Sequence, residues 1–214
     1  MGLIMGYELT RFCENTDEVI FEGVGKYDIP AIDPEPFEPC EFISFNYAKT
    51  SKRKDCGVHF FIHDYQFERV WREWKRYGAM LSEFSAVMTP DFSIYTDWPK
   101  ALQIYNHYRK HFVGAYLQTI GVKVYPTISW SDKDSFEWCF DGEPVGGTVC
   151  VSSVGTQRSK ETKKLFLDGY NAMIEKLNPE TIIFYGEVPK ECMGNIVRIK
   201  PFQDKFREVV TDGR

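Results

Sequence analysis

Acidic side chains follow several apolar segments of this 214-residue chain, near the points where predicted strands end. They are Asp64, Asp91, Asp132 and Glu187. The carboxyl ends of parallel strands meet at one side of a sheet or barrel, where sites are usually built. Two carboxyl groups gathered there could transfer protons or hold a divalent metal. The spacing fixes no pair; we take Asp91 and Asp132 as the candidate catalytic pair and assign no metal ligand.

The segment from Ser153 to Lys160 joins a predicted strand to a predicted helix through a glycine, hydroxyl groups and two cations. Exposed N–H groups and the helix dipole suit an anion at such a turn, and Arg158 could add a bidentate contact. The segment lacks the G-x-x-x-x-G-K-[ST] pattern of a P-loop. We therefore predict an anion site at Ser153, Gly155, Thr156 and Arg158; an ordinary capped helix is the alternative.

Polar and aromatic residues at the other predicted strand ends complete the candidate site. Tyr95 and Trp130 supply aromatic rings opposite the anion segment, beside Asp91 and Asp132. The remaining candidate ligand-binding residues are Asn46, Asp64 and Glu187. Polar residues are common wherever strands become loops, and Asp or Ser there often caps the next helix. A purely structural role is therefore the alternative for each of them.

His107 and His111 are four residues apart on a predicted helix and could form one edge of a metal site. They flank the apolar stripe beside Arg109 and Lys110, and the helix has no H-E-x-x-H pattern. We therefore predict that both are surface histidines. No G-x-S-x-G pattern marks a nucleophilic serine.

Short apolar runs alternate with segments of helical periodicity from residue 42 onward. Apolar residues recur at three- and four-residue steps, which predicts three helices in 67–81, 101–116 and 166–177. Asp97 is the expected N-cap of the second helix, Pro99 lies in its first turn, and Gly121 ends it. The predicted strands are 42–48, 58–64, 86–92, 122–130, 148–154, 181–186 and 196–202.

Several predicted strands are apolar almost throughout, which is typical of parallel strands covered on both faces. The fold class is therefore α/β, either an open doubly wound sheet or a closed barrel. Because no G-x-G-x-x-G pattern is present, we favour a TIM-like (β/α) barrel, or an incomplete barrel, of seven or eight strands. We expect a single domain over 1–214, with a Pro-rich N-terminal cap (1–41), strand–helix repeats (42–202) and a C-terminal helix or tail (203–214).

Charge and composition restrict the location and the partners of the chain. The net charge of −5 disfavours broad binding of duplex nucleic acid, which requires a basic face. The basic run from Lys49 to Lys54 fits a solvated loop. The sequence shows neither a signal peptide nor an apolar run of about 20 residues. Six cysteines without C-x-x-C spacing fit reduced thiols, so we expect a cytoplasmic protein without a membrane segment.

Five longer motifs resemble one known family. They are 89–99 (TPDFSIYTDWP), 101–106 (ALQIYN), 114–118 (GAYLQ), 124–132 (VYPTISWSD) and 136–142 (FEWCFDG). The resemblance is to domain of unknown function 4417, carried often by phages, prophages and bacterial mobile elements, and it runs from about residue 42 to residue 202. It implies an intracellular role in a phage or mobile-element setting. It brings no settled activity, cofactor or catalytic residue.

The residues favour an enzyme or a small-ligand binder with an anionic ligand, such as a nucleotide or a phosphate ester, at the carboxyl ends of the strands. One alternative is a non-catalytic accessory protein that binds a host or element-encoded macromolecule. A second alternative is a nucleic-acid-binding protein, although no helix-turn-helix pattern accompanies the acidic charge. The sequence specifies neither a cofactor nor an oligomeric state.

Overall fold

The computed structural model describes residues 21–199, whose central part is built from parallel strands. A four-stranded sheet has the order β3-β4-β5-β6, and a three-stranded sheet has the order β7-β8-β9. The strands are β3 Phe42–Ser44, β4 Gly57–His59, β5 Ala86–Met88, β6 Val124–Tyr125, β7 Thr148–Ser152, β8 Thr181–Tyr185 and β9 Ile196–Ile199. All pairs within these two sheets are parallel, which confirms the predicted α/β class.

The two sheets meet just after β6. Thr127 forms an isolated parallel bridge with Cys150, and the Ile128 N–H donates to the Cys150 carbonyl at 2.7 Å. The strands therefore lie side by side in the order in which they occur in the chain. Among residues 21–199 no pairing joins β9 back to β3, so the sheets are small and do not close into the predicted barrel.

Side chains alternate between two faces along each strand, as the pleat requires. Val58 and Val87 pack in a core beneath the helices near the first sheet, and Val149 packs in a second core near the other sheet. A third cluster lies on the opposite face and joins both sheets, with Met88 from β5 and Ile183 from β8 among its members. Both faces of the strands are thus covered, which explains their almost continuous apolar sequence.

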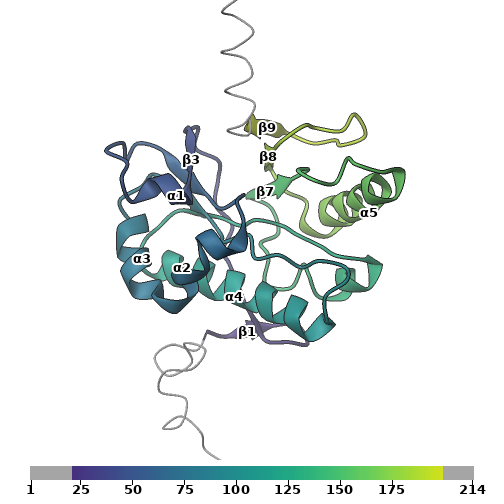
Figure 1. Cartoon of the computed structure of the whole chain (residues 1–214), viewed down its shortest axis with the longest axis horizontal. Helices are drawn as coiled ribbons and strands as arrows, with labels where there is room; N and C mark the ends of the chain where they lie inside the picture. Colours follow the sequence, from purple (N-terminus) through teal and green to yellow (C-terminus); the bar gives the residue numbers. More distant parts are fainter. Residues whose placement is uncertain (1–20, 200–214) are drawn as a thin grey trace, which may run out of the picture.

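Helices follow most of the strands and cover the outer faces of the sheets (Figure 1). They are α1 Phe45–Ala48, the 3-10 helix η2 Asp64–Gln66, α2 Glu68–Arg72, α3 Trp74–Leu81, α4 Lys100–Thr119, the 3-10 helix η3 Lys133–Glu137 and α5 Lys160–Leu177. The three predicted helices are confirmed, although the first is interrupted at Glu73, whose backbone (φ −126°, ψ 42°) is not helical.

Several predicted boundaries are wrong. The strands predicted over 58–64, 86–92 and 122–130 end earlier, at His59, Met88 and Tyr125. The strand predicted over 42–48 ends at Ser44, because Phe45 turns into α1 and stacks on Phe60 with a ring-centroid distance of 4.9 Å. Asp97 does not cap α4, because the N-cap is Pro99 and the helix has no side-chain cap. Gly121 adopts φ +80° directly after α4, in agreement with the predicted helix end.

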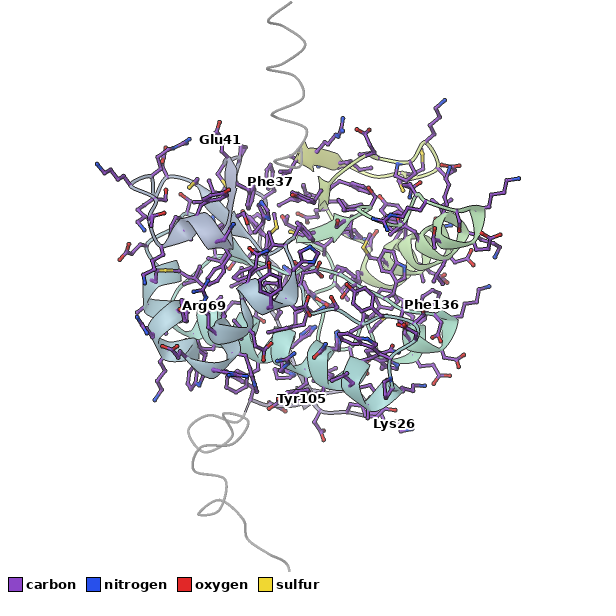
Figure 2. The ribbon with its side chains drawn as sticks, viewed as in Figure 1. Lys26, Phe37, Glu41, Arg69, Tyr105 and Phe136 are labelled. Carbon is purple, nitrogen blue, oxygen red and sulfur yellow. The ribbon has the colours of Figure 1, made fainter. Side chains whose placement is uncertain are left out.

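The N-terminal segment is less irregular than the sequence suggests. A short antiparallel pair, β1 Gly23–Val24 with β2 Ile29–Pro30, packs near α4. The Pro-rich stretch that follows then crosses the molecule: Lys26 lies at the α4 end, whereas Phe37 and Glu41 lie at the end that carries β3 and β9 (Figure 2). Residues 1–20 and 200–214, including the predicted C-terminal helix or tail, lie outside the described residues.

Candidate functional site

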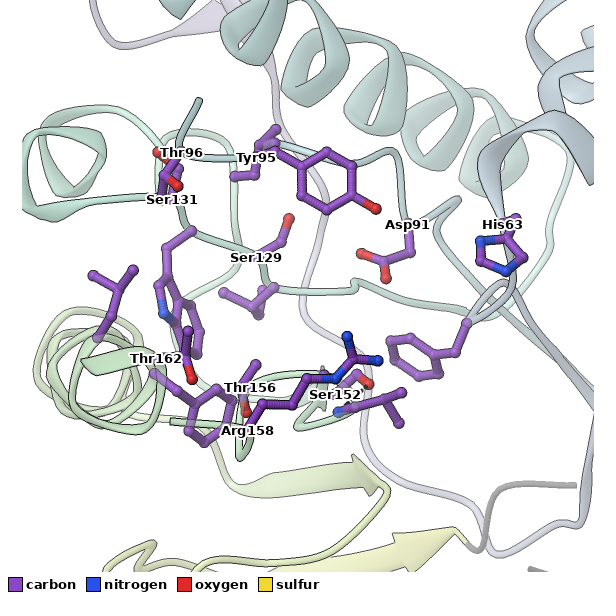
Figure 3. Close-up of a pocket in the computed structure, with 18 residues that line it drawn as sticks. His63, Asp91, Tyr95, Thr96, Ser129, Ser131, Ser152, Thr156, Arg158 and Thr162 are labelled. Atoms are coloured by element: carbon purple, nitrogen blue, oxygen red, sulfur yellow. Dashed lines mark hydrogen bonds between the residues drawn. The ribbon is translucent and has the colours of Figure 1, made fainter. Parts of the chain in front are cut away.

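A cavity of about 560 Å³ opens at the carboxyl ends of the strands (Figure 3). Its walls come from the segments that follow β4, β5, β6 and β7 and from the first turns of α5. Six of the predicted site residues line it: Asp91, Tyr95, Trp130, Gly155, Thr156 and Arg158. Parallel strands therefore bring together residues that are up to 67 positions apart (158 − 91).

Asp91 is partly exposed to this cavity, and no described residue forms a hydrogen bond or an ion pair with its carboxyl group. Its pKa is raised to about 7, chiefly by burial and in addition by the charge of Asp64, while the cation of Lys110 opposes both effects. A carboxyl group that titrates near neutrality can both donate and accept a proton at physiological pH. Asp91 therefore has the protonation behaviour of a general acid or base.

Arg158 lies in the loop between β7 and α5, which turns at Gly155 with φ +84°. Its guanidinium points into the cavity toward the carboxyl group of Asp91 (Figure 3). Arg158 is exposed, and within residues 21–199 it forms no hydrogen bond or salt bridge. A guanidinium directed into a cavity without a protein partner is suited to a bidentate contact with a phosphate or a carboxylate.

The start of α5 is capped by its own side chains. The Ser159 hydroxyl accepts a hydrogen bond from the Thr162 N–H at 3.1 Å, and the Thr162 hydroxyl accepts one from the Ser159 N–H at 3.1 Å. This capping box agrees with the structural alternative for the segment. Because the Thr162 N–H already has a partner within the helix, Arg158 is the group of this segment best able to bind an anion.

Aromatic rings form much of the remaining cavity wall. Trp130 and Phe166 have ring centroids 5.5 Å apart at an interplanar angle of 41°, and Phe61 and Tyr95 also line the cavity. Ser129 also lines the cavity, and its hydroxyl lies on the same side of the cavity as the Tyr95 ring (Figure 3). A few polar groups within a largely apolar wall are typical of sites for small organic ligands.

Two predicted site residues lie away from this cavity. Asp132 caps η3, where its carboxylate accepts a hydrogen bond from the Ser135 N–H at 3.1 Å. It lines a smaller pocket of about 140 Å³ beside Trp98. Asn46 is exposed in α1 and not at a strand end, because β3 stops at Ser44. The structure therefore does not place Asp132 in the same cavity as Asp91.

Three further candidates fix loops around the cavity. Asp64 accepts two hydrogen bonds from Ser93, one from its N–H at 2.9 Å and one from its hydroxyl at 2.8 Å. The buried hydroxyl of Ser153 donates to the Glu187 carbonyl at 2.6 Å, and the Glu187 carboxylate pairs with Arg198. Their observed contacts are those of loop-stabilising residues.

The cavity also contains residues that the sequence analysis missed. Ser129 directly precedes Trp130, and Thr162 follows Arg158 by four residues, so proximity in the chain to a predicted site residue was a usable signal. Phe166 belongs to the apolar stripe of α5, and its periodicity predicts core packing just as well as a cavity wall. His63 follows β4 and is exposed at the cavity rim.

The prediction that His107 and His111 are surface histidines is wrong. Their exposed fractions are 2% and 0%, because α4 is buried around most of its circumference between Asn106 and Ala115. Both rings lie near the buried side chain of Glu143, and one potential ligand atom from each of the three residues lies within 4.8 Å of the others. Among the described residues, this is the one group with metal-ligand character.

No helix within residues 21–199 is both long and apolar enough to cross a membrane.

Comparison with known proteins places the chain in a family. It is 35% identical to the "Gene 1 protein" of Mycobacterium phage L5 over 202 residues, covering 91% of this chain and 88% of that protein. It is 34% identical to the "Gene 1 protein" of Mycobacterium phage D29 over 201 residues, covering 90% and 73%. No solved structure matches it significantly. The family model "Domain of unknown function (DUF4417)" matches residues 21–203, and the chain therefore belongs to the DUF4417 family.

Proposed function

We propose that the cavity at the carboxyl ends of the strands binds a small anionic ligand, such as a nucleotide or another phosphate ester. The observation that carries this proposal is the guanidinium of Arg158, which points into the cavity and has no partner among the described residues. In this arrangement Arg158 binds the phosphate, and the hydroxyl group of Ser129 adds a hydrogen bond.

The size and the lining of the cavity support a ligand with a ring as well as an anionic group. Its volume of about 560 Å³ lies within the range of roughly 300–1,000 Å³ that is usual for small-molecule sites. The rings of Tyr95, Trp130 and Phe166 offer aromatic faces and edges to a planar base or sugar. A nucleotide combines these two chemical features.

We further propose that Asp91 transfers a proton if the bound ligand is a substrate. Its carboxyl group faces Arg158 across the cavity, so it lies beside the position of the anion (Figure 3). Asp132 takes no part in this proposal, because its carboxylate caps η3 outside the cavity.

The strand arrangement supports a related proposal about the fold. We take the seven parallel strands as one open, barrel-like array within a single domain. They follow one another in chain order across the Thr127–Cys150 bridge, and the third core cluster contains residues of both sheets. The family and its phage relatives support a cytoplasmic role in a phage or mobile-element setting.

A ligand screen tests the proposed function. The thermal midpoint of the full chain is measured with inorganic phosphate, nucleoside mono-, di- and triphosphates and sugar phosphates. A ligand at about 100 times its dissociation constant raises the midpoint by roughly 5 °C or more. Arg158→Ala removes this response, whereas Arg72→Ala, an exposed arginine of α2 outside the cavity, retains it. No response across the panel, or equal responses of the wild type and Arg158→Ala, contradicts the proposal.

A further inference from the structure

A second cluster of chemically active side chains lies in the interior of the protein, outside the set of residues that line the cavity. It combines His107 and His111, one turn apart on α4, with Glu143 from the loop between η3 and β7. The two imidazole rings have centroids 4.4 Å apart, and the side chains of His111 and Glu143 have no exposed surface. We propose that these three residues bind a divalent transition-metal ion of the Zn²⁺ type.

The hydrogen bonds of His111 leave one of its nitrogens with a lone pair directed at the cluster. Its Nδ1 lies 2.8 Å from the Pro30 carbonyl, which can only accept, so Nδ1 carries the N–H. In the neutral ring Nε2 then has a lone pair, and it lies 3.0 Å from Oε1 of Glu143, which is also an acceptor. Two acceptors at this distance require a proton or a metal ion between them.

His107 follows the same rule. Its Nε2 lies 3.1 Å from the Asp141 carbonyl and therefore carries the N–H, which leaves the lone pair on Nδ1. This Nδ1 is buried, and no described group binds it; the same holds for Oε2 of Glu143. Histidines that ligate metals almost always donate their other N–H to a carbonyl or carboxylate, as both rings do in this cluster.

The type of donor selects the class of metal. Two imidazole nitrogens and one carboxylate oxygen suit Zn²⁺ and related first-row ions, which prefer nitrogen to an all-oxygen environment. Donor atoms bound to one such ion at about 2 Å cannot be more than about 4 Å apart. One potential ligand atom of each of the three residues lies within 4.8 Å of the others, which is close to this limit.

The loop that carries Glu143 is shaped for close approach to α4. Gly142 adopts φ +74°, and a Cβ at this position would lie 2.6 Å from the Pro30 carbonyl oxygen and 2.9 Å from Nδ1 of His111. The Gly142 carbonyl accepts a hydrogen bond from the Ile32 N–H at 2.9 Å. This glycine allows its neighbours to bring the Asp141 carbonyl to His107 and the Glu143 carboxylate to His111.

Lys110 is the internal competitor for this site. Its ammonium lies 2.5 Å from Oε1 of Glu143 and 2.8 Å from the Thr127 carbonyl. It neutralises the buried carboxylate when no metal is bound, and its positive charge opposes the metal. Removal of this charge therefore strengthens metal binding, whereas removal of a ligand weakens it.

The test uses the full chain without a histidine tag, produced in zinc-supplemented medium. Elemental analysis measures metal per chain, and titration of the chelator-treated protein with Co²⁺ measures affinity through the visible absorption of the bound ion. We expect one ion per chain. Glu143→Gln lowers the affinity at least about tenfold, and Lys110→Met raises it about tenfold. Glu137→Gln, an exposed acid of η3, leaves it unchanged.

The outcomes separate this site from the proposed ligand cavity. A protein without metal that also binds no Co²⁺ overturns the proposal, and so does metal whose affinity is unchanged in Glu143→Gln. If Glu143→Gln does not fold, two other measurements decide. Tighter Co²⁺ binding by Lys110→Met, together with wild-type Co²⁺ absorption bands of nitrogen–oxygen coordination, supports the site. Unchanged affinity in Lys110→Met and the absence of those bands refute it. Neither result depends on Arg158.

Discussion

The ammonium of Lys110 lies 2.5 Å from Oε1 of Glu143, and both side chains are almost completely buried. Removal of one partner leaves the other charge in the interior without compensation. We therefore expect Glu143→Gln to lower the free energy of unfolding of the metal-free protein by about 3–5 kcal/mol. Urea denaturation in the presence of a chelator measures this change.

The matched control for this prediction is Glu137→Gln, which removes an exposed carboxylate and should change stability by less than about 0.5 kcal/mol. A loss below about 1 kcal/mol in Glu143→Gln would show that the pair contributes little in the folded protein.

Ligand affinity should fall as pH rises, because burial and the Asp64 charge raise the pKa of Asp91 to about 7. Below this pH Asp91 is neutral and tolerates an anion; above it the carboxylate repels one. Binding of inorganic sulfate should weaken roughly tenfold between about pH 6 and about pH 8. Isothermal titration calorimetry measures the affinities. Sulfate is the appropriate probe because its own charge is constant over this range.

Asp91→Asn separates this effect from those of the other charged groups near the cavity, which are Asp64, Lys110, His63 and Arg158. The variant should retain its low-pH affinity at high pH, and any remaining pH dependence belongs to those groups. An unchanged pH profile in the variant contradicts the role of Asp91.

The raised pKa of Asp91 also predicts that its carboxylate opposes folding above neutral pH. The free energy of unfolding of Asp91→Asn should therefore exceed that of the wild type there by at least about 1 kcal/mol, as urea denaturation at about pH 8 would measure.

Two glycines with nearly equal backbone angles should respond differently to alanine. A Cβ at Gly142 (φ +74°) would lie 2.6 Å from the Pro30 carbonyl oxygen, whereas a Cβ at Gly146 (φ +76°) would have no described atom within 4 Å. Gly146→Ala should cost about 1 kcal/mol from the left-handed backbone alone. Gly142→Ala should cost about 3 kcal/mol, since the steric overlap is added. Chemical denaturation of both variants gives the difference, and equal losses would refute the tight packing of this loop.

Gly169 links the packing of α5 to the shape of the cavity. A Cβ at this position would lie 2.2 Å from Nε1 of Trp130, a ring of the cavity wall. Alanine normally favours a helix over glycine by about 1 kcal/mol. We nevertheless expect Gly169→Ala to destabilise the protein and to weaken ligand binding, because the indole must move. Asn171→Ala, on the exposed face of α5, should preserve binding. A stabilised Gly169→Ala variant with intact affinity would contradict this prediction.

The sequence was sufficient to predict the strand–helix alternation, because apolar periodicity is a local property. Each of the seven predicted strand segments overlaps an observed strand, although residue 45 already belongs to α1. Whether the sheet closes depends on pairing between β3 and β9, which lie more than 150 residues apart (196 − 44). A local sequence pattern does not predict pairing between strands that far apart.

The candidate site was predictable in part for the same reason. Asp91, Trp130 and Arg158 share the cavity because parallel strands place their carboxyl ends together. Ser153 and Glu187 follow the same pattern, yet the Ser153 hydroxyl donates to the Glu187 carbonyl and the Glu187 carboxylate pairs with Arg198. A polar residue at a strand end has the same sequence signature whether it lines a site or stabilises a loop. The burial of His107 could not be predicted, because it depends on the distant loop around Asp141.

The chain-ordered pairing of the strands has a consequence for folding. Each strand from β4 to β9 joins the edge formed by the strand before it, through direct pairing or through the Thr127–Cys150 bridge. Pairing between strands that are neighbours in sequence closes shorter loops than a pairing of β9 with β3 would, which lowers the entropic cost of assembly. The sheet can thus grow in one direction while the chain leaves the ribosome, each strand–helix unit covering the previous edge before the next is synthesised.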